Sequence, residues 1–447
     1  MSSSRTELFR SIKGTFDILP EPSSSDDTLI AGSAAWRFVE RKIADVMDRY
    51  GVREIRTPIL EPTALIARGV GESTDIVTKE MFAFERGDTQ YVLRPEVTAP
   101  VMRAYLQHHL DQQRSVQKLF YIGPCFRAER PQKGRYRQFH QFGVEYIGSS
   151  GVVADAEVIV LMIDIYRALG LSDCRLRLNT LGDESARPAF KDALVDFLRP
   201  HASKLSEISV RRLAENPLRI LDTKSAEERA ILDEGPRLID FVPVESRERF
   251  DRLKDLLGGQ GIMFVEDPFL VRGLDYYTET AFELESDLLD GAQNALAGGG
   301  RYDLLAREIG AKTAVPAVGF AAGMERLFLA LHAASSALQS DAAPELYIVV
   351  LGEKAQEWAS VTSRALRQAG VRVEVDISGR SAKAQMREAN RLGALSVVVV
   401  GDDELQSGVA RLRDMANAGE IEIRLDAEAL KSGVASSLPV VDPEATR

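Results

Sequence analysis

Apolar and polar residues alternate with two different periods along the chain. Between Ala34 and Tyr50, apolar side chains recur every three or four positions and Gly51 ends the run, which predicts a helix. Short strand-like runs follow, with a second helical pattern at Thr98–His109. Because turns separate most of these runs, we expect antiparallel hairpins instead of βαβ units. The predicted strands are Arg53–Thr57, Met81–Phe84, Gln90–Arg94, Lys118–Phe126 and Gln138–Ile147.

The middle of the chain changes in character. Residues 172–261 are charged, rich in Leu and Ala, and carry four helical patterns, which predicts a helical insertion. These patterns lie at Ala189–Leu198, Lys204–Leu213, Ala226–Ile231 and Val244–Leu257. Strand-like runs at Met263–Val265 and Ala281–Leu284, followed by a helix at Met324–His332, return to the first architecture.

A small, polar segment at residues 333–344, ending in Pro344, is typical of an interdomain linker. Beyond it, strand and helix patterns alternate from Leu346 to Val400, which predicts a small α/β domain. We therefore expect an α+β protein. Its predicted parts are residues 1–171 and 262–332 of one domain, the insertion at 172–261, the linker at 333–344 and an α/β domain at 345–447.

Composition places the chain among ordinary globular proteins. Its 447 residues are 45% hydrophobic and 28% charged, which fits two or three domains. The longest apolar runs, such as Val158–Ile163 and Val397–Val400, are far shorter than the roughly 20 residues that a membrane helix needs. The N-terminus lacks the apolar core of a secretory signal, so we expect a cytoplasmic location and no membrane contact.

Several kinds of chemistry are disfavoured by the sequence. The net charge of −11 argues against non-specific coating of nucleic acid, although local basic patches remain. Cys125 and Cys174 lie 49 positions apart without a Cys/His cluster, which excludes a disulfide framework and a structural zinc site. His108 and His109 have no neighbouring metal ligands. Neither a P-loop nor a Gly-x-Gly-x-x-Gly fingerprint occurs, so a bound nucleotide must be held in another way.

A cationic loop joins two of the predicted strands. Residues 127–137 carry five cations against one acid, a density that suits a polyanion. A solvated hairpin tip is the alternative. The cations are Arg127, Arg130, Lys133, Arg135 and Arg137.

The strand after this loop has one polar face. Because side chains two positions apart share a face, Phe139, Gln141, Gly143 and Glu145 point one way and His140 the other. With a glycine leaving space between two polar groups, this face predicts the floor of a small-ligand pocket. An exposed sheet face is the alternative.

Four cations recur at helical spacing in the C-terminal domain. Intervals of 3, 4 and 4 residues place them on one helix face, which is compatible with a surface that binds a polyanion or with a solvated surface. These cations are Arg380, Lys383, Arg387 and Arg391.

The cationic loop and its flanking strands, Arg127–Glu129 and Arg135–Glu145, resemble motif 2 of class II aminoacyl-tRNA synthetases, specifically the histidyl-tRNA synthetase family. Other segments resemble that family in the correct order over residues 13–425. They are the N-terminal Lys13–Asp17, motif 1 at Thr57–Glu61, the amino-acid contact segment Leu93–Thr98, the two histidine signatures Leu270–Tyr277 and Gly298–Tyr302, and motif 3 at Val318–Leu327.

The resemblance implies a fold, a reaction and partners. The fold is a six-stranded antiparallel sheet flanked by helices, with a helical insertion and a C-terminal α/β anticodon-binding domain, in a homodimer with Pro58 at its interface. The reaction joins L-histidine to tRNA(His) through histidyl-adenylate, with ATP as substrate and Mg²⁺ as cofactor. The alternatives are a non-catalytic regulatory subunit of ATP phosphoribosyltransferase, which ordinarily lacks the anticodon domain, and a general RNA-binding protein, which the acidic charge disfavours.

The resemblance also implies roles for residues that handle ATP. Arg127 is implied to hold the α-phosphate, and Arg272 to act catalytically between the histidine carboxylate and that phosphate. Arg326, also expected to be catalytic, and Arg135 would hold the distal phosphates with Mg²⁺ between them. Glu129 completes the predicted ATP site.

The resemblance also implies which residues bind histidine and tRNA. Glu96, Thr98 and Gln141 would bind the substrate amine, and Glu145 with Tyr277 would bind the two ring nitrogens. Val97, Tyr276 and Tyr302 are expected to complete the histidine pocket. The glycines 298–300 would allow close backbone approach to the ligand, with a plain turn as the alternative. We expect tRNA to be bound by the loop residues Gln132 and Arg137 and by the four C-terminal cations.

Overall fold

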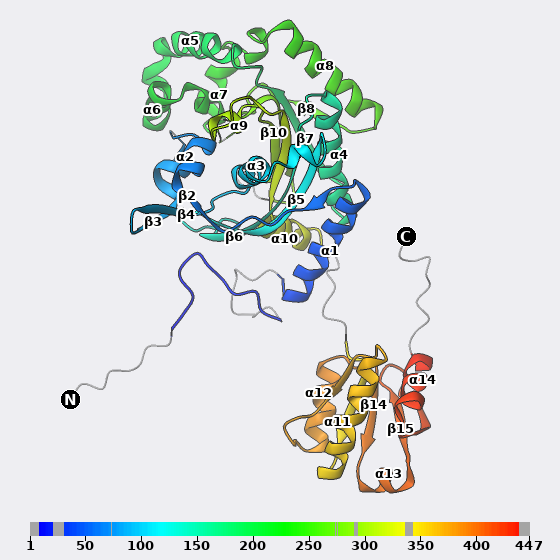
Figure 1. Ribbon diagram of the computed structural model, residues 1–447. Coiled ribbons are helices and arrows are strands. Elements are labelled where there is room, and N and C mark those ends of the chain that lie inside the picture. The colour runs from blue at the N-terminus through cyan, green and yellow to red at the C-terminus, as the bar shows by residue number, and fades with distance from the viewer. Residues whose placement is uncertain are drawn as a thin grey trace, which may run out of the picture. The chain divides into compact units, whose positions relative to one another are not determined.

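The computed structural model describes residues 9–20, 31–72, 74–272, 274, 276–289, 294–335 and 343–437. The chain forms two compact units that divide between Gln339 and Ser340, and each unit has its own sheet and apolar core (Figure 1). Most of the linker predicted at 333–344 lies outside the described residues. The two units are therefore described separately.

An eight-stranded sheet organises the first unit. Six of its strands are antiparallel to their neighbours, which confirms the predicted antiparallel centre. In sheet order they are β5 (Gln117–Phe126), β6 (Gln138–Ile147), β11 (Ala317–Gly323), β10 (Ala295–Arg301), β9 (Thr278–Ser286) and β7 (Cys174–Thr180). Beyond the six expected strands, β1 (Arg53–Glu54) and β8 (Phe264–Glu266) add a short parallel strand at each edge.

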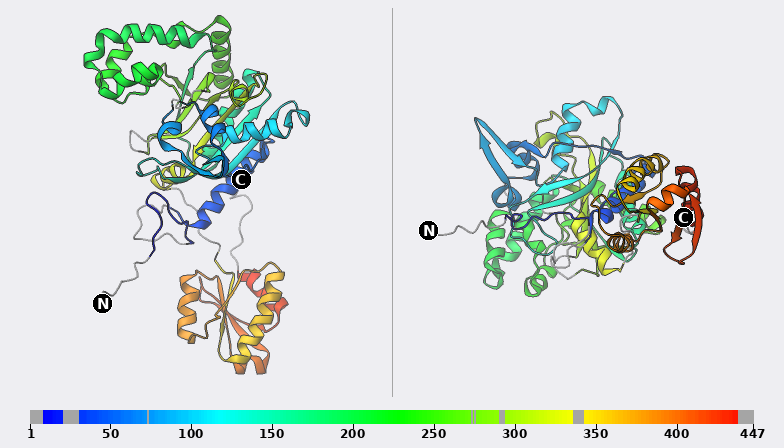
Figure 2. Two further views of the ribbon diagram at one scale, coloured as in Figure 1. Left: turned by 60° about the vertical axis from the view of Figure 1, so that its left-hand side comes forward. Right: turned by 90° about the horizontal axis from the view of Figure 1, so that it is seen from below.

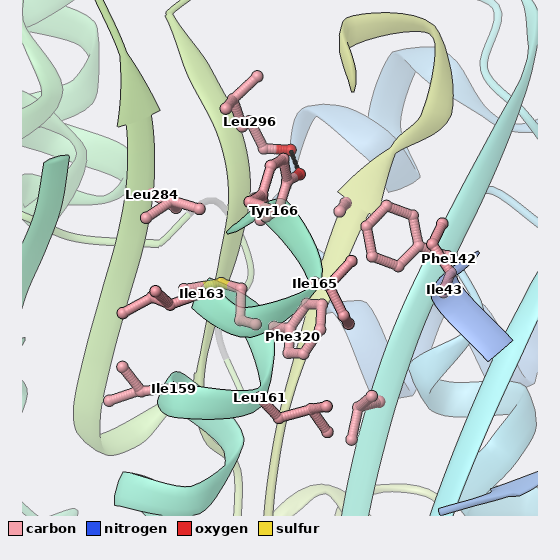
Figure 3. Close-up of a cluster of buried hydrophobic side chains, with 14 of the residues drawn as sticks. Ile43, Phe142, Ile159, Leu161, Ile163, Ile165, Tyr166, Leu284, Leu296 and Phe320 are labelled. Carbon is pink, nitrogen blue, oxygen red and sulfur yellow. Dashed lines mark hydrogen bonds between the residues drawn. The ribbon is translucent and has the colours of Figure 1, made fainter. Parts of the chain in front are cut away.

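Four helices pack on one face of this sheet and share one apolar core with it. They are α1 (Ser33–Arg49), α4 (Val152–Ala168), α8 (Val244–Gly259) and α10 (Met324–Ala333). The sequence pattern did not predict α4, because nine of its side chains are buried and the alternation typical of a surface helix is lost. Figure 3 shows Ile163 and Tyr166 of α4 among sheet residues, with the Tyr166 hydroxyl donating to the Leu296 carbonyl at 3.2 Å.

A second core lies on the other face of the sheet. It includes residues of α2 (Thr63–Val70), α3 (Thr98–Gln107) and α9 (Leu305–Glu308). Two of the predicted early strands do not join the main sheet. They pair instead in a separate three-stranded sheet of order β2 (Leu60–Pro62), β4 (Thr89–Leu93) and β3 (Phe82–Arg86). The helical turn η1 (Ile76–Glu80) precedes β3, and the helical turn η2 (Leu110–Gln112) follows α3.

The helical segment of the first unit is shorter than predicted. Residues 174–180 are strand β7, and α8 packs on the main core through Phe250 and Leu257, so the predicted boundaries at 172 and 261 were both wrong. The signal for β7 is its alternation of buried Leu with Arg. Figure 2 shows the remaining helices grouped at one end of the sheet. They are α5 (Ala186–Leu198), α6 (Glu207–Glu215) and α7 (Ala226–Asp233), with the turns η3 (Arg199–Lys204), η4 (Pro217–Asp222) and η5 (Leu238–Asp240).

The second unit is a small α/β domain around a five-stranded sheet. Its strands, in sheet order, are β13 (Val373–Val375), β12 (Leu346–Val350), β14 (Ser396–Val400), β15 (Val409–Asp414) and β16 (Glu420–Arg424). The first three are parallel, as the alternating pattern predicted, whereas the antiparallel pair β15–β16 was not predicted. The helices are α11 (Glu353–Gln368), α12 (Ala382–Arg391), α13 (Asp402–Ser407) and α14 (Ala427–Ser437).

Candidate functional site

A cavity of about 300 Å³ lies over strands β6, β9, β10 and β11, on the sheet face away from α4. Its lining brings together segments that lie more than 200 residues apart in the sequence. Ten of the predicted site residues line it, namely Glu96, Thr98, Arg127, Glu129, Arg135, Gln141, Arg272, Tyr276, Tyr277 and Arg326. Of the remaining histidine-pocket residues, Val97, Glu145 and Tyr302 are buried beneath this lining.

Three guanidinium groups gather in one part of the cavity. Burial, reinforced by the charge of nearby Arg135, lowers the pKa of Arg326. Arg326 donates to the Ala295 carbonyl at 2.8 Å, and Arg127 donates to the Pro95 carbonyl at 3.1 Å. Glu129 pairs with Arg135 at 3.3 Å and only partly offsets these charges. A phosphate chain would relieve the mutual repulsion of such cations.

Arg272 lies flat against the strand β10. A Cβ atom at Gly298 would fall 2.1 Å from its Nη2 atom, so only glycine leaves room for this guanidinium. Its Nη1 atom donates to Glu283 at 2.7 Å. Its Nε atom is buried and has no hydrogen-bond partner among the described residues. The glycines were predicted to let the backbone approach a ligand, whereas the side chain that fills the space at Gly298 is Arg272.

The floor of the cavity contains a buried carboxyl group. Glu145 on β6 is 1% exposed and accepts hydrogen bonds from the Thr98 hydroxyl, at 2.7 Å, and from the Tyr302 hydroxyl. Burial raises the pKa of Glu145 to about 8 despite these donors. A buried carboxyl group with a pKa near 8 can exchange a proton close to neutral pH. It can also pair with a ligand that is cationic or carries an N–H group.

The alternation predicted for β6 is confirmed. Phe139 and Gln141 line the cavity with Glu145 beneath it, whereas Phe142 and Val144 belong to the opposite core. His140 also turns away, and its Nδ1 atom lies 3.0 Å from Glu325. The polar face is thus covered rather than exposed to solvent.

Glu96 organises the start of α3. Its carboxylate accepts the backbone N–H groups of Thr98, at 2.7 Å, and Ala99, at 3.0 Å. Burial raises its pKa. Val97, between Glu96 and Thr98, is 1% exposed and packs in the second core, so its side chain does not line the cavity. Glu96 therefore both lines the cavity and fixes the segment that carries Thr98.

The residues not predicted from the sequence include Glu80 and Glu283 in the cavity lining and Tyr121, which is buried beneath it. Tyr121 on β5 is 3% exposed, and its hydroxyl occupies the space that a Cβ at Gly143 would need, 2.3 Å away. Glu80 and Glu283 line the cavity beside the arginines, and burial raises the pKa of Glu80. Gly143 in the β6 pattern was the sequence signal for Tyr121, because a glycine within a strand leaves space for a neighbouring side chain. No comparable signal marks Glu80 or Glu283, because sheet pairing and chain folding, rather than a local sequence period, bring their neighbours at the cavity to them.

The two loop residues predicted to meet tRNA lie outside the cavity lining. Gln132 forms a backbone bridge with Arg135. Arg137 donates to the carbonyls of Glu129, at 3.5 Å, and Lys13, at 3.4 Å. The N-terminal segment is thereby tied to the cationic loop.

The cationic stripe of the second unit is less regular than predicted. Arg380 precedes α12 and pairs with Asp376 at 2.6 Å, so it does not belong to one helix face with the others. Glu388 pairs with Arg391 at 2.7 Å. Lys383 and Arg387 are exposed on α12 and form no ion pair within the described part of the chain.

Two other features of the described residues bear on partners. None of their helices has the length and apolarity of a membrane span. They contain no group of three His, Cys, Asp or Glu side chains arranged to hold a metal ion.

Comparisons with known proteins agree on one family. Residues 25–327 match the histidyl-tRNA synthetase family model, and residues 345–434 match an anticodon binding domain. A histidine–tRNA ligase from Chloroherpeton thalassium is 48% identical over 419 residues, covering 93% of this chain and 95% of the relative. One from Thermosynechococcus vestitus is 45% identical, covering 90% and 94%. The crystal structure of apo S. aureus histidyl-tRNA synthetase has a TM-score of 0.78 at 36% identity, covering 96% of this chain and 100% of that one. The chain therefore belongs to the histidyl-tRNA synthetase family.

Proposed function

We propose that this chain is a histidine–tRNA ligase, which activates L-histidine with ATP to histidyl-adenylate and pyrophosphate and then transfers histidine to the 3′ end of tRNA(His). The observation that carries the proposal is a cavity lined by a guanidinium cluster, with a buried, hydrogen-bonded carboxyl group directly beneath its floor. The first feature suits ATP, and the second suits an imidazole.

In the activation step, the carboxylate oxygen of histidine attacks the α-phosphorus of ATP and the bond to pyrophosphate breaks. Negative charge grows on the phosphate oxygens as this happens, so fixed cations stabilise the transition state more than the ground state. We assign this role to Arg127 and Arg272. Arg135 and Arg326 would hold the departing pyrophosphate, since their donors face the same cavity.

Recognition of the imidazole is assigned to Glu145 and Tyr277. A carboxylate accepts an N–H donor, and a phenol hydroxyl serves the other ring nitrogen as donor or acceptor. An isostere without these nitrogens would leave buried polar groups unpaired. In comparable sites such an analogue is disfavoured by about 10⁴-fold in kcat/KM. Thr98, Gln141 and Glu96 line the same cavity and would accept the substrate amine.

Magnesium would enter this site together with ATP. Mg²⁺ usually takes one or two protein carboxylates and completes its shell with phosphates and water. The carboxylate of Glu129 lies in the guanidinium cluster and fits that requirement without a dedicated cluster of ligands. When bound there, the ion would supply positive charge that neutralises part of the phosphate charge.

The remaining partners are proposals of the same kind. We propose tRNA(His) as the nucleic-acid partner, held through the anticodon binding domain at residues 345–434. A homodimer with Pro58 at its interface follows from the family resemblance. We propose the cytoplasm as the place of action, because aminoacyl-tRNA is used there in translation.

The alternative is a regulatory subunit of ATP phosphoribosyltransferase. The match of residues 345–434 to an anticodon binding domain favours the ligase, because such a subunit ordinarily lacks that domain. The arginine cluster also favours catalysis, since a binding module has no need to stabilise a transition state with pentacoordinate phosphorus.

The decisive measurement is amino-acid-dependent ATP–pyrophosphate exchange by the purified protein, followed by histidylation of tRNA(His). We expect exchange with histidine and none with alanine or serine. Exchange with one of these but not with histidine would overturn the substrate assignment. Absence of all exchange, with retained folding, would favour the regulatory alternative.

Arg326→Ala is expected to raise the KM for ATP by about 10-fold or more, because one charge-assisted contact to phosphate is lost. The KM for histidine should stay within about twofold, since Arg326 lies in the guanidinium cluster rather than beside Glu145. Steady-state exchange at varied ATP and varied histidine separates the two constants. An increased KM for histidine alone would contradict the assignment.

Lys383→Glu combined with Arg387→Glu is expected to raise the KM for tRNA by about 10-fold at physiological salt, because two exposed cations would be replaced by anions that repel the phosphate backbone. The exchange reaction needs no tRNA and should be unchanged. The matched control is Lys354→Glu with Arg364→Glu, on α11 of the same unit. An unaltered KM for tRNA in the first double variant shows that the α12 surface does not bind tRNA.

A further inference from the structure

Arg272 lies in a segment without regular secondary structure, between β8 and β9. The orientation of its guanidinium therefore depends on side-chain contacts rather than on a helix or strand. Its side chain is 19% exposed, and its Nη1 atom reaches the Oε2 atom of Glu283 at 2.7 Å. This is the one ion pair of Arg272 within the described residues.

Glu283 is fixed by the sheet on which it lies. In the pairing of β9 with β10, Glu283 is the direct partner of Gly298, the residue whose missing side chain makes room for Arg272. On the other side, in the pairing of β9 with β7, its direct partner is Arg177, whose Nη1 atom lies 3.5 Å from its Oε1 atom. The carboxylate of Glu283 thus lies between the guanidinium groups of Arg272 and Arg177. Its strand, β9, is paired with β10 on one side and with β7 on the other.

We propose that Glu283 is a positioning residue for the adenylation reaction. Its carboxylate holds the Arg272 guanidinium flat over Gly298, so that the Nε and Nη2 atoms stay directed at the reacting carboxylate and α-phosphate. Fixed orientation of a charged donor lowers the cost of reorganisation when charge develops in the transition state. This inference rests on the proposed function, since it concerns the same reaction.

A neighbouring carboxylate provides a matched control. Glu285 lies two positions further along β9, on the same face, and is 7% exposed in its side chain. It pairs with Arg177 at 2.7 Å and with Arg175 at 3.2 Å but, among the described residues, forms no ion pair with Arg272. Arg177 keeps Asp267 as a second partner when Glu285 is changed. Removing the charge of Glu285 therefore tests loss of a buried carboxylate in the same strand without releasing Arg272.

The test compares five variants in histidine-dependent exchange. Glu283→Gln is expected to lower kcat by about 10- to 100-fold, the loss typical of a displaced catalytic group, with each KM changed less than about threefold. Glu285→Gln should stay within about threefold of the unmodified chain. Arg272→Ala with Glu283→Gln should be no slower than Arg272→Ala alone, because Glu283 acts through Arg272.

The outcomes separate the possible explanations. Equal losses in Glu283→Gln and Glu285→Gln, or an additive loss in the double variant, would show that Glu283 only stabilises the sheet and would overturn the inference. Full activity of Glu283→Gln would overturn it as well. Glu283→Asp, which keeps the charge on a shorter side chain, should recover part of kcat. A lack of exchange by the unmodified chain would instead contradict the proposed function, so the two failures are distinguishable.

Discussion

Arg272→Ala is expected to lower the kcat of histidine-dependent ATP–pyrophosphate exchange by about 10³-fold, close to 4 kcal/mol of lost transition-state stabilisation. The physical reason is the position of Arg272, which is packed on Gly298, tied to Glu283 by one Nη atom and left with an unpaired Nε donor in the cavity. Because charge on the α-phosphate peaks in the transition state, the loss should appear in kcat more than in KM.

The control for this prediction is Arg175→Ala. Arg175 lies on β7 and is 48% exposed, and its guanidinium pairs with Glu285 and Asp287 outside the cavity. Its removal should leave exchange nearly unchanged. Arg272→Lys should recover little, because an ammonium group does not reproduce the planar fork of donors. Undiminished exchange by Arg272→Ala would remove this side chain from the mechanism.

Glu145→Gln is expected to lower kcat/KM for histidine by about 100- to 1,000-fold, because an amide, unlike the carboxyl group, cannot ionise to pair with the imidazole N–H. The KM for ATP should change little, since the phosphate-facing arginines lie elsewhere in the cavity lining. The measurement is exchange at varied histidine with saturating ATP. Glu157→Gln, on α4 at the opposite face, is the control. An unchanged kcat/KM would show that Glu145 binds the substrate as a neutral acid or not at all.

The same variant has a second readout in stability. The folded pKa of Glu145 is about 8, well above its unfolded value near 4.5. As pH rises from about 4.5 to 8, the unfolded chain releases this proton while the folded protein keeps it, so Glu145 costs stability progressively across that window, on the order of 5 kcal/mol in total. Glu145→Gln lacks this titration. Its free energy of unfolding, relative to that of the unmodified chain, should therefore be higher at pH 8 than at pH 5.

Local pattern was informative where a periodicity survives in the fold. The alternation along β6 correctly separated Gln141 and Glu145 from His140. It failed for α4, whose apolar residues lie on nearly all sides, and for β7, whose buried leucines were attributed to a helical region. Four cations at helical spacing did not make one stripe either, because Arg380 precedes α12 and turns to Asp376.

The sequence by itself determined the family, the residue types of the cavity and the order of its segments. Motif residues such as Arg127 and Arg272 were recognisable because each lies in a short contiguous segment whose residue types and spacing identify it. Tertiary structure alone decided which side chains hold them. Glu283 and Tyr121 are ordinary strand residues in sequence, and they acquire a role only because sheet pairing brings Gly298 beside the first and Gly143 beside the second. A contact between distant strands depends on register and packing, which no local period encodes.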